Sequence, residues 1–388
     1  MNVSEFIAAR KKKDPTLRIG SLKEITKSQK RPPMSTGNIV ADYVTSIGGI
    51  PRGAVTEIRG FNSSGKTTLS AMIAANHQKL VKAGYATGAI LYIDFEFAVD
   101  EDYFAALGLD INDEETFVFY QPDTLEEGFN MFLDMTKAGL LALGIVDSVA
   151  GASAGAEYDA AIGKASIGLK ARALNQSLRM TVGPMKVHGT GLILINHIQS
   201  KIPVTFGEKQ SAMRGIIETI SPGGRAMEFY PSLRLELSKP YQNKSEVHDE
   251  LTNEKSKQIT STEVVITAFK NKVGVPHRTA RMRVAFGKGF SQNFSAFHIL
   301  VDHGIIKKKT GGHFSFPDEL LPPTGIKQPV GEDNIVAGLD ASSEWADKLV
   351  SAASKLVLNQ QVDQADVDIL VVDGEVIDPE TGEVVTDV

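Results

Sequence analysis

The sequence predicts an α/β protein with a mostly parallel central sheet and helices on both of its faces. Three observations lead to this fold class. Short apolar runs alternate with helical stretches from about residue 53 to residue 196, a glycine-rich phosphate-binding motif follows the first run, and further β-rich runs come in close succession after residue 230. Alternating strands and helices are typical of parallel sheets, whereas strands in close succession are typical of antiparallel pairs.

The expected elements follow in order along the chain. The first strand covers residues 54–59 and leads through a glycine loop into a helix that ends at Gly84. Strands are then expected at 89–94, 116–120, 140–147 and 189–196, with helices near 100–107 and 168–182. Between residues 196 and 223 the pattern stops. A structureless stretch of about 26 residues inside a compact domain is either functional or disordered.

The region after residue 230 changes character. Residues 232–237, 262–269 and 279–286 predict antiparallel strands added to one edge of the sheet. Beyond Ala296 the pattern predicts a small separate α/β unit with a Pro-rich interruption and a tail, and no internal repeat is evident.

Composition bounds the class of protein. The 388 residues, 42% hydrophobic and 23% charged, suit two or three globular domains and exclude a fibre or a wholly disordered chain. The absence of Cys excludes disulfides, thiolate zinc sites and a cysteine nucleophile, and it fits a reducing compartment. No apolar run approaches ~18 residues and the N-terminus is charged, so we expect a cytoplasmic protein without a membrane partner.

The two ends of the chain carry opposite charge. Residues 1–34 hold nine Lys or Arg against three acids, and residues 331–388 hold fourteen acids against two Lys. Each run is either a solvated terminus or a functional one. In the functional interpretation the basic head binds a neighbouring protomer or a phosphate backbone, and the acidic tail competes with that backbone for basic surface.

A nucleotide site is expected at the glycine loop, which fits G-x-x-x-x-G-K-[ST] and lies between a predicted strand and a predicted helix. Its backbone N–H groups can wrap phosphates, Lys66 can neutralise β and γ oxygens, and the Thr67 hydroxyl can ligate Mg²⁺. The alternative is an accidental match on a tight turn. The candidate binding residues are Gly60, Phe61, Asn62, Ser63, Ser64, Gly65, Lys66, Thr67 and Thr68.

Two carboxylates follow buried strands near this loop. Asp147 ends the run at 140–147 and is expected to complete the Mg²⁺ shell, although an Asp in this place can also be a simple strand-end cap. Glu96 lies two residues past Asp94, at the carboxyl edge of the sheet where ligands bind, and can orient an attacking water. A salt bridge to a nearby base is the alternative for Glu96.

Several segments carry a family resemblance beyond the phosphate loop. They are STGNIVADYVTSIGGIPRGAVTEIRG, GFNSSGKTTL, YIDFEFAVDEDY, QPDT, VDSVA, IGLKARALNQSLR, GGRAMEFYPSLRLEL and FKNKVGVP. In order and approximate spacing, over residues 35 to 310, the chain resembles the RecA family of bacterial strand-exchange recombinases. The resemblance implies a basic oligomerisation segment (1–36), a RecA-type P-loop NTPase core with DNA-binding loops (37–297), a small α/β C-terminal domain (298–360) and an acidic tail (361–388).

The resemblance also implies an activity and partners. The protein is expected to be a DNA-dependent ATPase that uses ATP and Mg²⁺, forms a helical homo-filament on single-stranded DNA and exchanges strands with a homologous duplex. Single-strand-binding and mediator proteins are further implied partners. Two other classes stay open: a hexameric RecA-fold helicase, which should lack the FKNK and GGRAMEFY segments, and an ATP-gated filament-forming regulator without useful turnover, against which Glu96 argues.

Roles around the nucleotide carry over residue by residue. Glu96 matches the glutamate that activates water, and Asp100 and Tyr103 match groups that hold adenine. Phe286 is an aromatic wall from a neighbouring subunit, although ordinary core packing is the alternative for both aromatic residues. Lys270 and Lys272 match lysines that reach the γ-phosphate of the adjacent subunit's ATP, where the alternative is a solvated edge strand.

DNA contact is implied for two loops and one helix. The first loop corresponds to about residues 157–167, and its helix places Arg172 and Arg179 on nearly one face, where two merely exposed arginines are the alternative. The long loop, about 197–222, ends in two glycines that would permit close approach of the strand. The candidates there are Lys201, Phe206, Lys209, Arg214, Gly223, Gly224 and Arg225.

Some residues depart from the family pattern. The family's usual Gln, which senses the γ-phosphate and relays it to the DNA loop, is replaced by His197, which puts a titratable group at this catalytic position. A core or surface histidine is the alternative. Asn62 stands where a Glu is usual, Lys164 stands where an acid is usual, and the long loop is longer. These departures favour the phage-encoded branch of the family.

Overall fold

The computed structural model describes most of the chain. The described ranges are 2–14, 17–29, 31–158, 168–200, 219–238, 241–248, 255–324, 326–362, 370–372 and 375–377. The predicted DNA-binding residues Lys201, Phe206, Lys209 and Arg214, and also Lys164, lie outside the described residues.

One large sheet organises the described residues, and its parallel part confirms the predicted fold class. The order of the strands along the sheet is β12-β11-β10-β8-β1-β5-β4-β2-β3, with β9 paired to β10. The six strands from β8 to β3 pair in parallel. They are β1 (Val55–Gly60), β2 (Ala89–Asp94), β3 (Phe117–Tyr120), β4 (Leu141–Asp147), β5 (Gly191–His197) and β8 (Pro231–Leu237).

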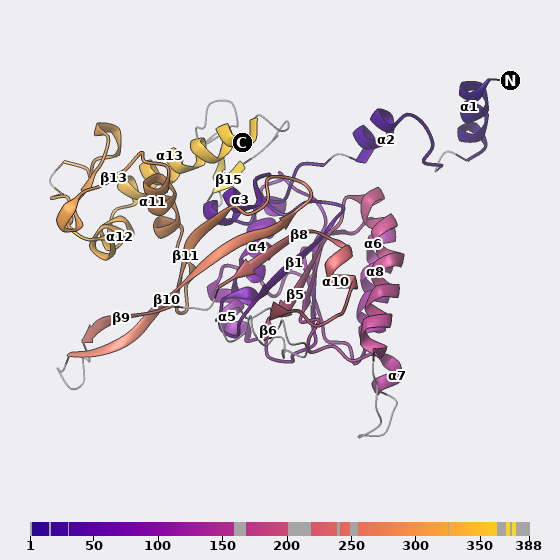
Figure 1. Ribbon diagram of the computed structural model, residues 1–388, viewed down its shortest axis with the longest axis horizontal. Coiled ribbons are helices and arrows are strands. Elements are labelled where there is room, and N and C mark those ends of the chain that lie inside the picture. The colour runs from indigo at the N-terminus through magenta and orange to yellow at the C-terminus, as the bar shows by residue number, and fades with distance from the viewer. Residues whose placement is uncertain are drawn as a thin grey trace, which may run out of the picture.

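The strands after residue 230 pair as the sequence predicts. β8 is followed by β9 (Tyr241–His248), β10 (Lys255–Asn271), β11 (Thr279–Ala285) and β12 (Gly289–Phe290). β8 pairs antiparallel with β10, and β10 pairs antiparallel with β11, which confirms the antiparallel strands expected there. β8 also runs parallel to β1, a pairing that was not predicted because a β-rich run shows that a strand forms but not which strands it pairs with. β9 and the first part of β10 project from the body as a two-stranded ribbon (Figure 1).

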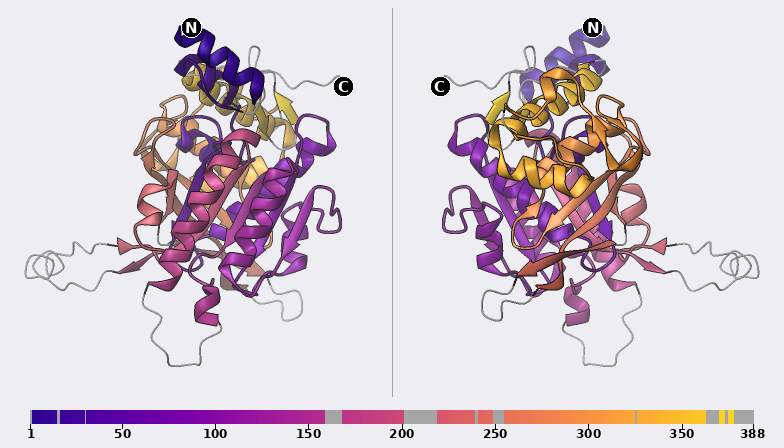
Figure 2. Two further views of the ribbon diagram at one scale, coloured as in Figure 1. Left: turned by 90° about the vertical axis from the view of Figure 1, so that its right-hand side faces the viewer. Right: turned by 90° about the vertical axis from the view of Figure 1, so that its left-hand side faces the viewer.

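Helices cover both faces of the sheet, as the alternating sequence predicts. Within β5, Leu192 and Leu194 face one hydrophobic cluster, and Ile193 and Ile195 face the other. The first cluster includes residues of α6 (Leu125–Lys137) and α8 (Leu169–His188), which lie side by side (Figure 2, left). The second includes residues of α3 (Ile39–Thr45), α4 (Lys66–Lys82), α11 (Gln292–Asp302) and α13 (Ser343–Val362). Side chains along β5 therefore alternate between the two helical layers, as they do in any strand.

Helix ends follow their capping residues. Thr124 and Glu127 form a capping box at the start of α6, and α8 ends at Gly189 with a φ of 71°. α8 runs to His188 rather than to 182, and it contains Pro184. The helix continues past the proline because Met185 in its last turn remains buried in the core.

The terminal segments add smaller elements. α1 (Val3–Lys13) buries none of its residues, and α2 (Leu22–Gln29) follows it; both lie apart from the body of the molecule (Figure 1). The expected boundary at 297/298 falls within α11, whose residues belong to the main core. The remaining described elements are α5 (Glu101–Ala106), α7 (Gly155–Tyr158), β6 (Gln199–Ser200), β7 (Thr219–Ile220), α10 (Ala226–Phe229), β13 (Lys307–Lys308), η1 (Thr310–Gly312), β14 (Phe314–Ser315), η2 (Asp318–Leu320), α12 (Glu332–Ala341), β15 (Leu370–Val372) and β16 (Glu375–Ile377).

A buried carboxylate in α3 leads to a stability prediction. Burial raises the pKa of Asp42 to about 7, although hydrogen bonds from Ser35 and Thr36 oppose the shift. In the unfolded chain Asp42 releases its proton near pH 3.8. The contribution of protonated Asp42 to the free energy of unfolding is therefore complete below pH 3.8 and is lost as pH rises through about 7.

We expect Asp42→Asn to remove this pH dependence, because an amide can accept from Thr36, donate to the Ser35 oxygen and carry no charge. We compare the unfolding free energy of the variant with that of the wild type at each pH. The difference should shift in favour of the variant by about 1–3 kcal/mol from pH 5 to pH 8. Denaturant unfolding at the two pH values measures this difference. A free-energy difference that is the same at both values would contradict the prediction.

Candidate functional site

The glycine loop lies between β1 and α4, where backbone packing demands glycine at two positions. A Cβ on Gly60 would come within 2.6 Å of Ser64 Oγ and 2.7 Å of the Leu237 carbonyl oxygen. Gly65 has a φ of 89°, and a Cβ there would come within 2.8 Å of the Phe290 ring. The loop can therefore curl tightly at the N-terminus of α4, where free N–H groups favour an anion.

Lys66 is folded onto this loop. Its Nζ donates to the carbonyl oxygens of Gly60 at 3.2 Å and Phe61 at 2.8 Å. Burial lowers the pKa of Lys66, while the negative charges of Asp147 and Glu96 oppose that shift. The ammonium group thus donates to neutral carbonyl oxygens, and the oxygens of a bound phosphate can replace them as its partners.

Asp147 collects two hydroxyl donors at the end of β4. Thr67 Oγ1 and the Tyr92 hydroxyl both donate to Asp147 Oδ2 at 2.7 Å. Burial nevertheless raises the pKa of Asp147, helped by the nearby charges of Glu96 and Asp94. A cation in front of this carboxylate would favour its charged form.

Glu96 is held by a turn that follows β2. Asp94 Oδ1 accepts from the backbone N–H groups of Glu96 at 2.9 Å and Phe97 at 3.1 Å, and Gln121 donates to Asp94 Oδ2 at 3.0 Å. Phe97 takes a left-handed φ of 53°. This Asx-type turn points the Glu96 side chain back toward the sheet edge.

Two donors converge on one oxygen of Glu96. Ser148 Oγ donates to Oε1, and His197 Nε2 lies 2.9 Å from the same Oε1. Burial raises the pKa of Glu96, but these two hydrogen bonds, together with the charges of His197 and Lys66, outweigh burial and lower it overall. Glu96 is therefore a carboxylate at neutral pH, and both of these hydrogen bonds are made by Oε1 rather than by Oε2.

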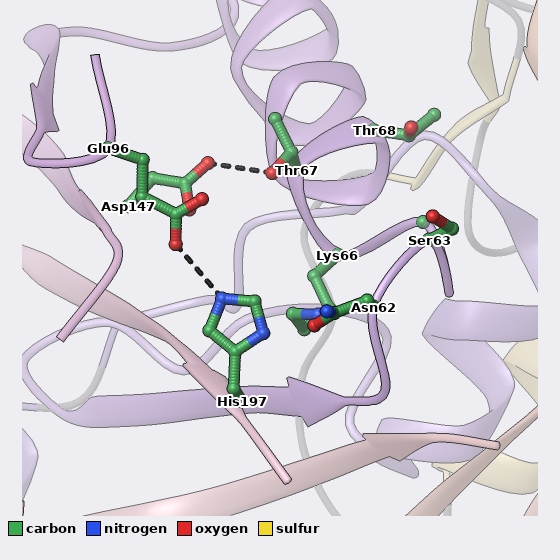
Figure 3. Close-up of a pocket in the computed structure, with 9 residues that line it drawn as sticks. Asn62, Ser63, Lys66, Thr67, Thr68, Glu96, Asp147 and His197 are labelled. Atoms are coloured by element: carbon green, nitrogen blue, oxygen red, sulfur yellow. Dashed lines mark hydrogen bonds and ion pairs between the residues drawn. The ribbon is translucent and has the colours of Figure 1, made fainter. Parts of the chain in front are cut away.

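These side chains share one pocket of roughly 500 Å³. Figure 3 shows Glu96 and Asp147 on one side, His197 at the end of β5 below them, and Lys66 at the start of α4. The lining residues are Asn62, Ser63, Gly65, Lys66, Thr67, Thr68, Glu96, Asp147 and His197. The predicted phosphate, Mg²⁺ and water-activating residues thus come together in space.

The oxygen donors in this pocket fit Mg²⁺. Among the described residues no group of three or more Asp, Glu, His or Cys side chains is arranged to hold a metal alone. Mg²⁺ is usually bound by one or two protein oxygens, with phosphates and water completing the shell. Thr67 Oγ1 and Asp147 Oδ2, 2.7 Å apart, are a hydroxyl and a carboxylate of the required kind.

The residues expected to hold adenine lie beside the loop, with one exception. Asp100 caps α5 by accepting from the Tyr103 backbone N–H at 2.7 Å, and the Tyr103 hydroxyl lies 2.7 Å from Thr68 Oγ1. Phe286, between β11 and β12, is 57% exposed and does not line the pocket. Its side chain is available to a molecule other than its own chain.

Lys270 and Lys272 lie at the end of β10. Their Nζ atoms donate to backbone carbonyl oxygens of α10, at 2.5 Å to Glu228 and 3.4 Å to Phe229. Burial, aided by the charge of Lys272, lowers the pKa of Lys270 to about 8. Neither lysine lines the described pocket of its own chain.

The candidate DNA residues that are described lie on the α8 side of the sheet. Arg172 and Arg179 are exposed on α8, opposite its buried side chains Leu174 and Leu178. Arg225 is exposed at the start of α10.

The two glycines before Arg225 have an intramolecular role. Gly223 has a φ of 103°, and a Cβ there would come within 2.7 Å of Met227 and 2.9 Å of Leu174. Gly224 has a φ of 64°. Both glycines are therefore required by backbone conformation, and Gly223 also by the packing of the chain itself.

A polar network on this face was not predicted. Arg59 pairs with Glu236 at 2.7 Å, stacks 3.8 Å from the centre of the Phe269 ring and donates to Ser221 Oγ at 3.3 Å. Beside it, Asn196 donates to the Pro222 carbonyl oxygen at 2.8 Å. Arg59 and Asn196 are register partners on β1 and β5. They hold residues 221–222, at the end of the long loop, against the sheet.

Sequence reasoning also missed three supports of the carboxylates. Ser148 and Tyr92 each donate to a site carboxylate, and Asp94 shapes the turn before Glu96. The usable signal was Tyr92 itself, because a tyrosine in a fully apolar strand needs a partner for its hydroxyl. Nothing local distinguished Ser148 from any other residue after a strand.

Comparisons with known proteins show which proteins this chain is similar to. A family model described as the RecA N-terminal domain matches residues 7–291. Protein RecA of Borrelia hermsii strain HS1 / DAH is 34% identical over 324 residues, covering 84% of this chain and 82% of the relative. Protein RecA of Rubrobacter xylanophilus is 34% identical over 294 residues, covering 76% and 77%. Protein RecA of Cutibacterium acnes is 31% identical over 350 residues, covering 90% and 87%.

Proposed function

We propose roles for individual residues of this chain. The chain belongs to the RecA family and is an ATP-dependent recombinase that acts in DNA recombination and repair. Family members are DNA-dependent ATPases that bind DNA and form homo-filaments. None of the described helices is both long and apolar enough to cross a membrane. The observation that carries the assignment of roles is the convergence of Lys66, Glu96 and Asp147 on one pocket beside the glycine loop.

ATP binds with its phosphates along residues 60–68. Lys66 exchanges its loop carbonyl oxygens for β and γ oxygens, because a charge-assisted contact is the stronger one. Mg²⁺, held by Thr67 and Asp147, would neutralise developing charge on the phosphates. Glu96 orients the attacking water through Oε2, since Oε1 is already taken by Ser148 and His197.

Part of the site comes from the neighbouring protomer. Lys270 and Lys272 lie outside their own pocket, and a surface lysine beside α10 can reach an ATP bound to the next copy. Phe286, exposed on the β11–β12 connection, covers adenine in the same way, opposite Asp100 and Tyr103. A head-to-tail interface whose rotation does not close into a ring builds an open helical filament, and homo-filaments are typical of the family.

DNA lies on the α8 side of the sheet. Arg172 and Arg179 supply phosphate contacts from one face of α8, and the long loop and Arg225 supply the rest. Single-stranded DNA occupies this surface first and a homologous duplex is then sampled beside it. The sequence tolerance of recombination requires contacts mainly to the backbone and by stacking.

A strand-exchange assay tests this function. Circular single-stranded DNA and a linear duplex are mixed with protein and ATP, and electron microscopy follows the assemblies. We expect filaments and exchanged products with a homologous duplex, and no product with a heterologous one. Rings that unwind both duplexes alike would favour a helicase, and filaments without exchange would favour a regulator.

The acidic end of the chain gives a further prediction. The residues beyond Val362 include nine acids and no Lys or Arg, so they compete with duplex DNA for basic surface. Deleting residues 363–388 should raise affinity for duplex DNA about 3–30-fold at low salt, and the gain should shrink as salt rises. α13 ends at Val362, so this deletion spares it. A tail of the same length with Asn and Gln for its acids is the matched control and should behave like the deletion. Equal affinity of all three proteins across a salt titration would mean a merely solvated tail.

A further inference from the structure

Lys170 lies in the first turn of α8, where a positive charge disfavours the helix. The helix begins after Gly168 with no side-chain cap and no acidic residue in its first turn. Because the N-terminus of a helix already carries partial positive charge, a lysine there destabilises the helix unless another contact offsets the effect. Lys170 is also partly buried, and burial lowers its pKa while the charge of Glu157 opposes that shift. The stability of α8 alone therefore does not explain this lysine.

The contact made by Lys170 leads from α8 to another part of the chain. Its Nζ donates to the Ala150 carbonyl oxygen at 2.7 Å, in the turn that follows β4. Residues four apart share a face of a helix, so Lys170 lies on the side of Leu174, which is buried in the core. Arg172 projects from the exposed side instead. The two basic residues of this first turn therefore serve different partners.

The turn that accepts from Lys170, residues 148–152, also holds Glu96. The Gly151 N–H donates to the Ser148 carbonyl oxygen at 3.1 Å and to Ser148 Oγ at 3.2 Å, and Ser148 Oγ itself donates to Glu96 Oε1. A Cβ on Gly151 would come within 3.0 Å of the Phe95 carbonyl oxygen and 3.2 Å of Glu96 Cγ. The backbone of the turn thus lies directly against Glu96, and a displacement of the turn would displace the carboxylate.

We propose that Lys170 is a positioning residue for ATP hydrolysis, which ties α8 to the 148–152 turn and so holds Glu96 in place when DNA fixes α8 through Arg172. Lys170 touches neither the nucleotide nor the DNA and acts through Ser148. The rate of hydrolysis on DNA then depends on the hydrogen bond between Lys170 and Ala150. This inference rests on the proposed roles of Glu96 and Arg172.

Three substitutions isolate this hydrogen bond. Lys170→Met keeps an unbranched side chain of similar size but removes the donor, whereas Lys170→Arg keeps a charged donor. Lys186→Met, at an exposed position in the last turn of the same helix, is the matched control. With saturating ATP and single-stranded DNA, Lys170→Met should hydrolyse ATP about 5–50-fold more slowly, because a small misplacement of a catalytic group costs this much. Lys170→Arg should recover most of the rate, and Lys186→Met should match the wild type.

Binding and stability measurements separate positioning from the other roles of a lysine. Fluorescence anisotropy with labelled single-stranded DNA and a non-hydrolysable ATP analogue should give Lys170→Met an affinity within about twofold of the wild type, since Lys170 makes no phosphate contact. A lower affinity with wild-type turnover at saturating DNA would make Lys170 a phosphate contact. A lower free energy of unfolding with wild-type turnover would make it a structural cap. Either result would overturn the proposal.

A double variant tests the route through Ser148. If Lys170 acts through this residue, Lys170→Met combined with Ser148→Ala should be no slower than the slower of the two single variants. Defects that multiply would contradict the proposed route. Should Lys170→Met not fold, Lys170→Gln takes its place, because its amide ends one atom short of Nζ, and an undiminished rate there would also overturn the proposal.

Failure of the underlying assignments would look different. If Glu96 does not activate water, Glu96→Gln hydrolyses ATP at the wild-type rate. If DNA does not lie on α8, Arg172→Ala binds single-stranded DNA as the wild type does. Loss of turnover in Lys170→Met, with both of those variants defective, would support the proposal.

Discussion

Glu96→Gln should lower the rate of ATP hydrolysis about 10²–10⁴-fold while ATP binding persists. The amide keeps the size of the side chain, and its carbonyl oxygen can still accept from Ser148 and His197. What it loses is the negative charge that attracts a proton of the attacking water. Filaments on DNA should then stay assembled, because turnover that releases them is blocked.

Single-turnover hydrolysis and filament lifetime on single-stranded DNA measure the two effects. Glu101→Gln, an exposed carboxylate in α5, is the matched control and should hydrolyse ATP at the wild-type rate. Lys66→Ala should differ from Glu96→Gln by losing ATP affinity as well, because it removes a charge-assisted phosphate contact. Normal hydrolysis by Glu96→Gln would reject its role.

Mixing two inactive variants should restore hydrolysis if the site is shared between protomers. Glu96→Gln and Lys272→Ala each carry one lesion, yet an intact Glu96 from one protein can meet an intact Lys272 from the other. Random equimolar mixing makes such interfaces about a quarter of the total, so the mixture should approach about a quarter of wild-type turnover. A site built within one chain would recover none.

Controls make the mixing result specific. Each variant mixed with its own kind should stay inactive, and Lys348→Ala, at an exposed ion pair in α13, should behave like the wild type in place of Lys272→Ala. Full activity in a Lys270→Ala/Lys272→Ala double variant would return both lysines to a solvated edge strand. DNA stimulation follows from a shared site, because hydrolysis then requires neighbours on one strand.

Much of the fold could be predicted because its strands are strongly apolar. The run at 89–94 became β2 with the same bounds, since six consecutive buried residues have no other place in a sheet covered on both faces. The parallel pairing of β8 with β1 and the length of the β9–β10 ribbon were not predictable, because pairing partners are set by tertiary contacts.

The site divides in the same way. Lys66 and Thr67 could be predicted from a motif with a physical mechanism, and Asp147 could be predicted from its place at the end of a buried strand. The contact between His197 and Glu96 spans residues 101 positions apart, so spacing could not foresee it. The roles of Ser148 and Arg59 were missed for the same reason, because their partners Glu96 and Glu236 lie far away in the sequence.

The pairing of β1 with β5 has a consequence for which changes of length the protein can tolerate. Arg59 and Asn196 face the layer that contains α8, and their successors Gly60 and His197 face the nucleotide. Because strand side chains alternate, inserting one residue within β5 would send Asn196 toward the phosphates and His197 toward the other layer. Insertions between Ser200 and Thr219 would leave the facing of the β1 and β5 side chains unchanged. Arg59 and Asn196 hold the chain again at Ser221 and Pro222, after that stretch. Variation in length among relatives should therefore gather in that stretch and be absent from the last residues of the two strands.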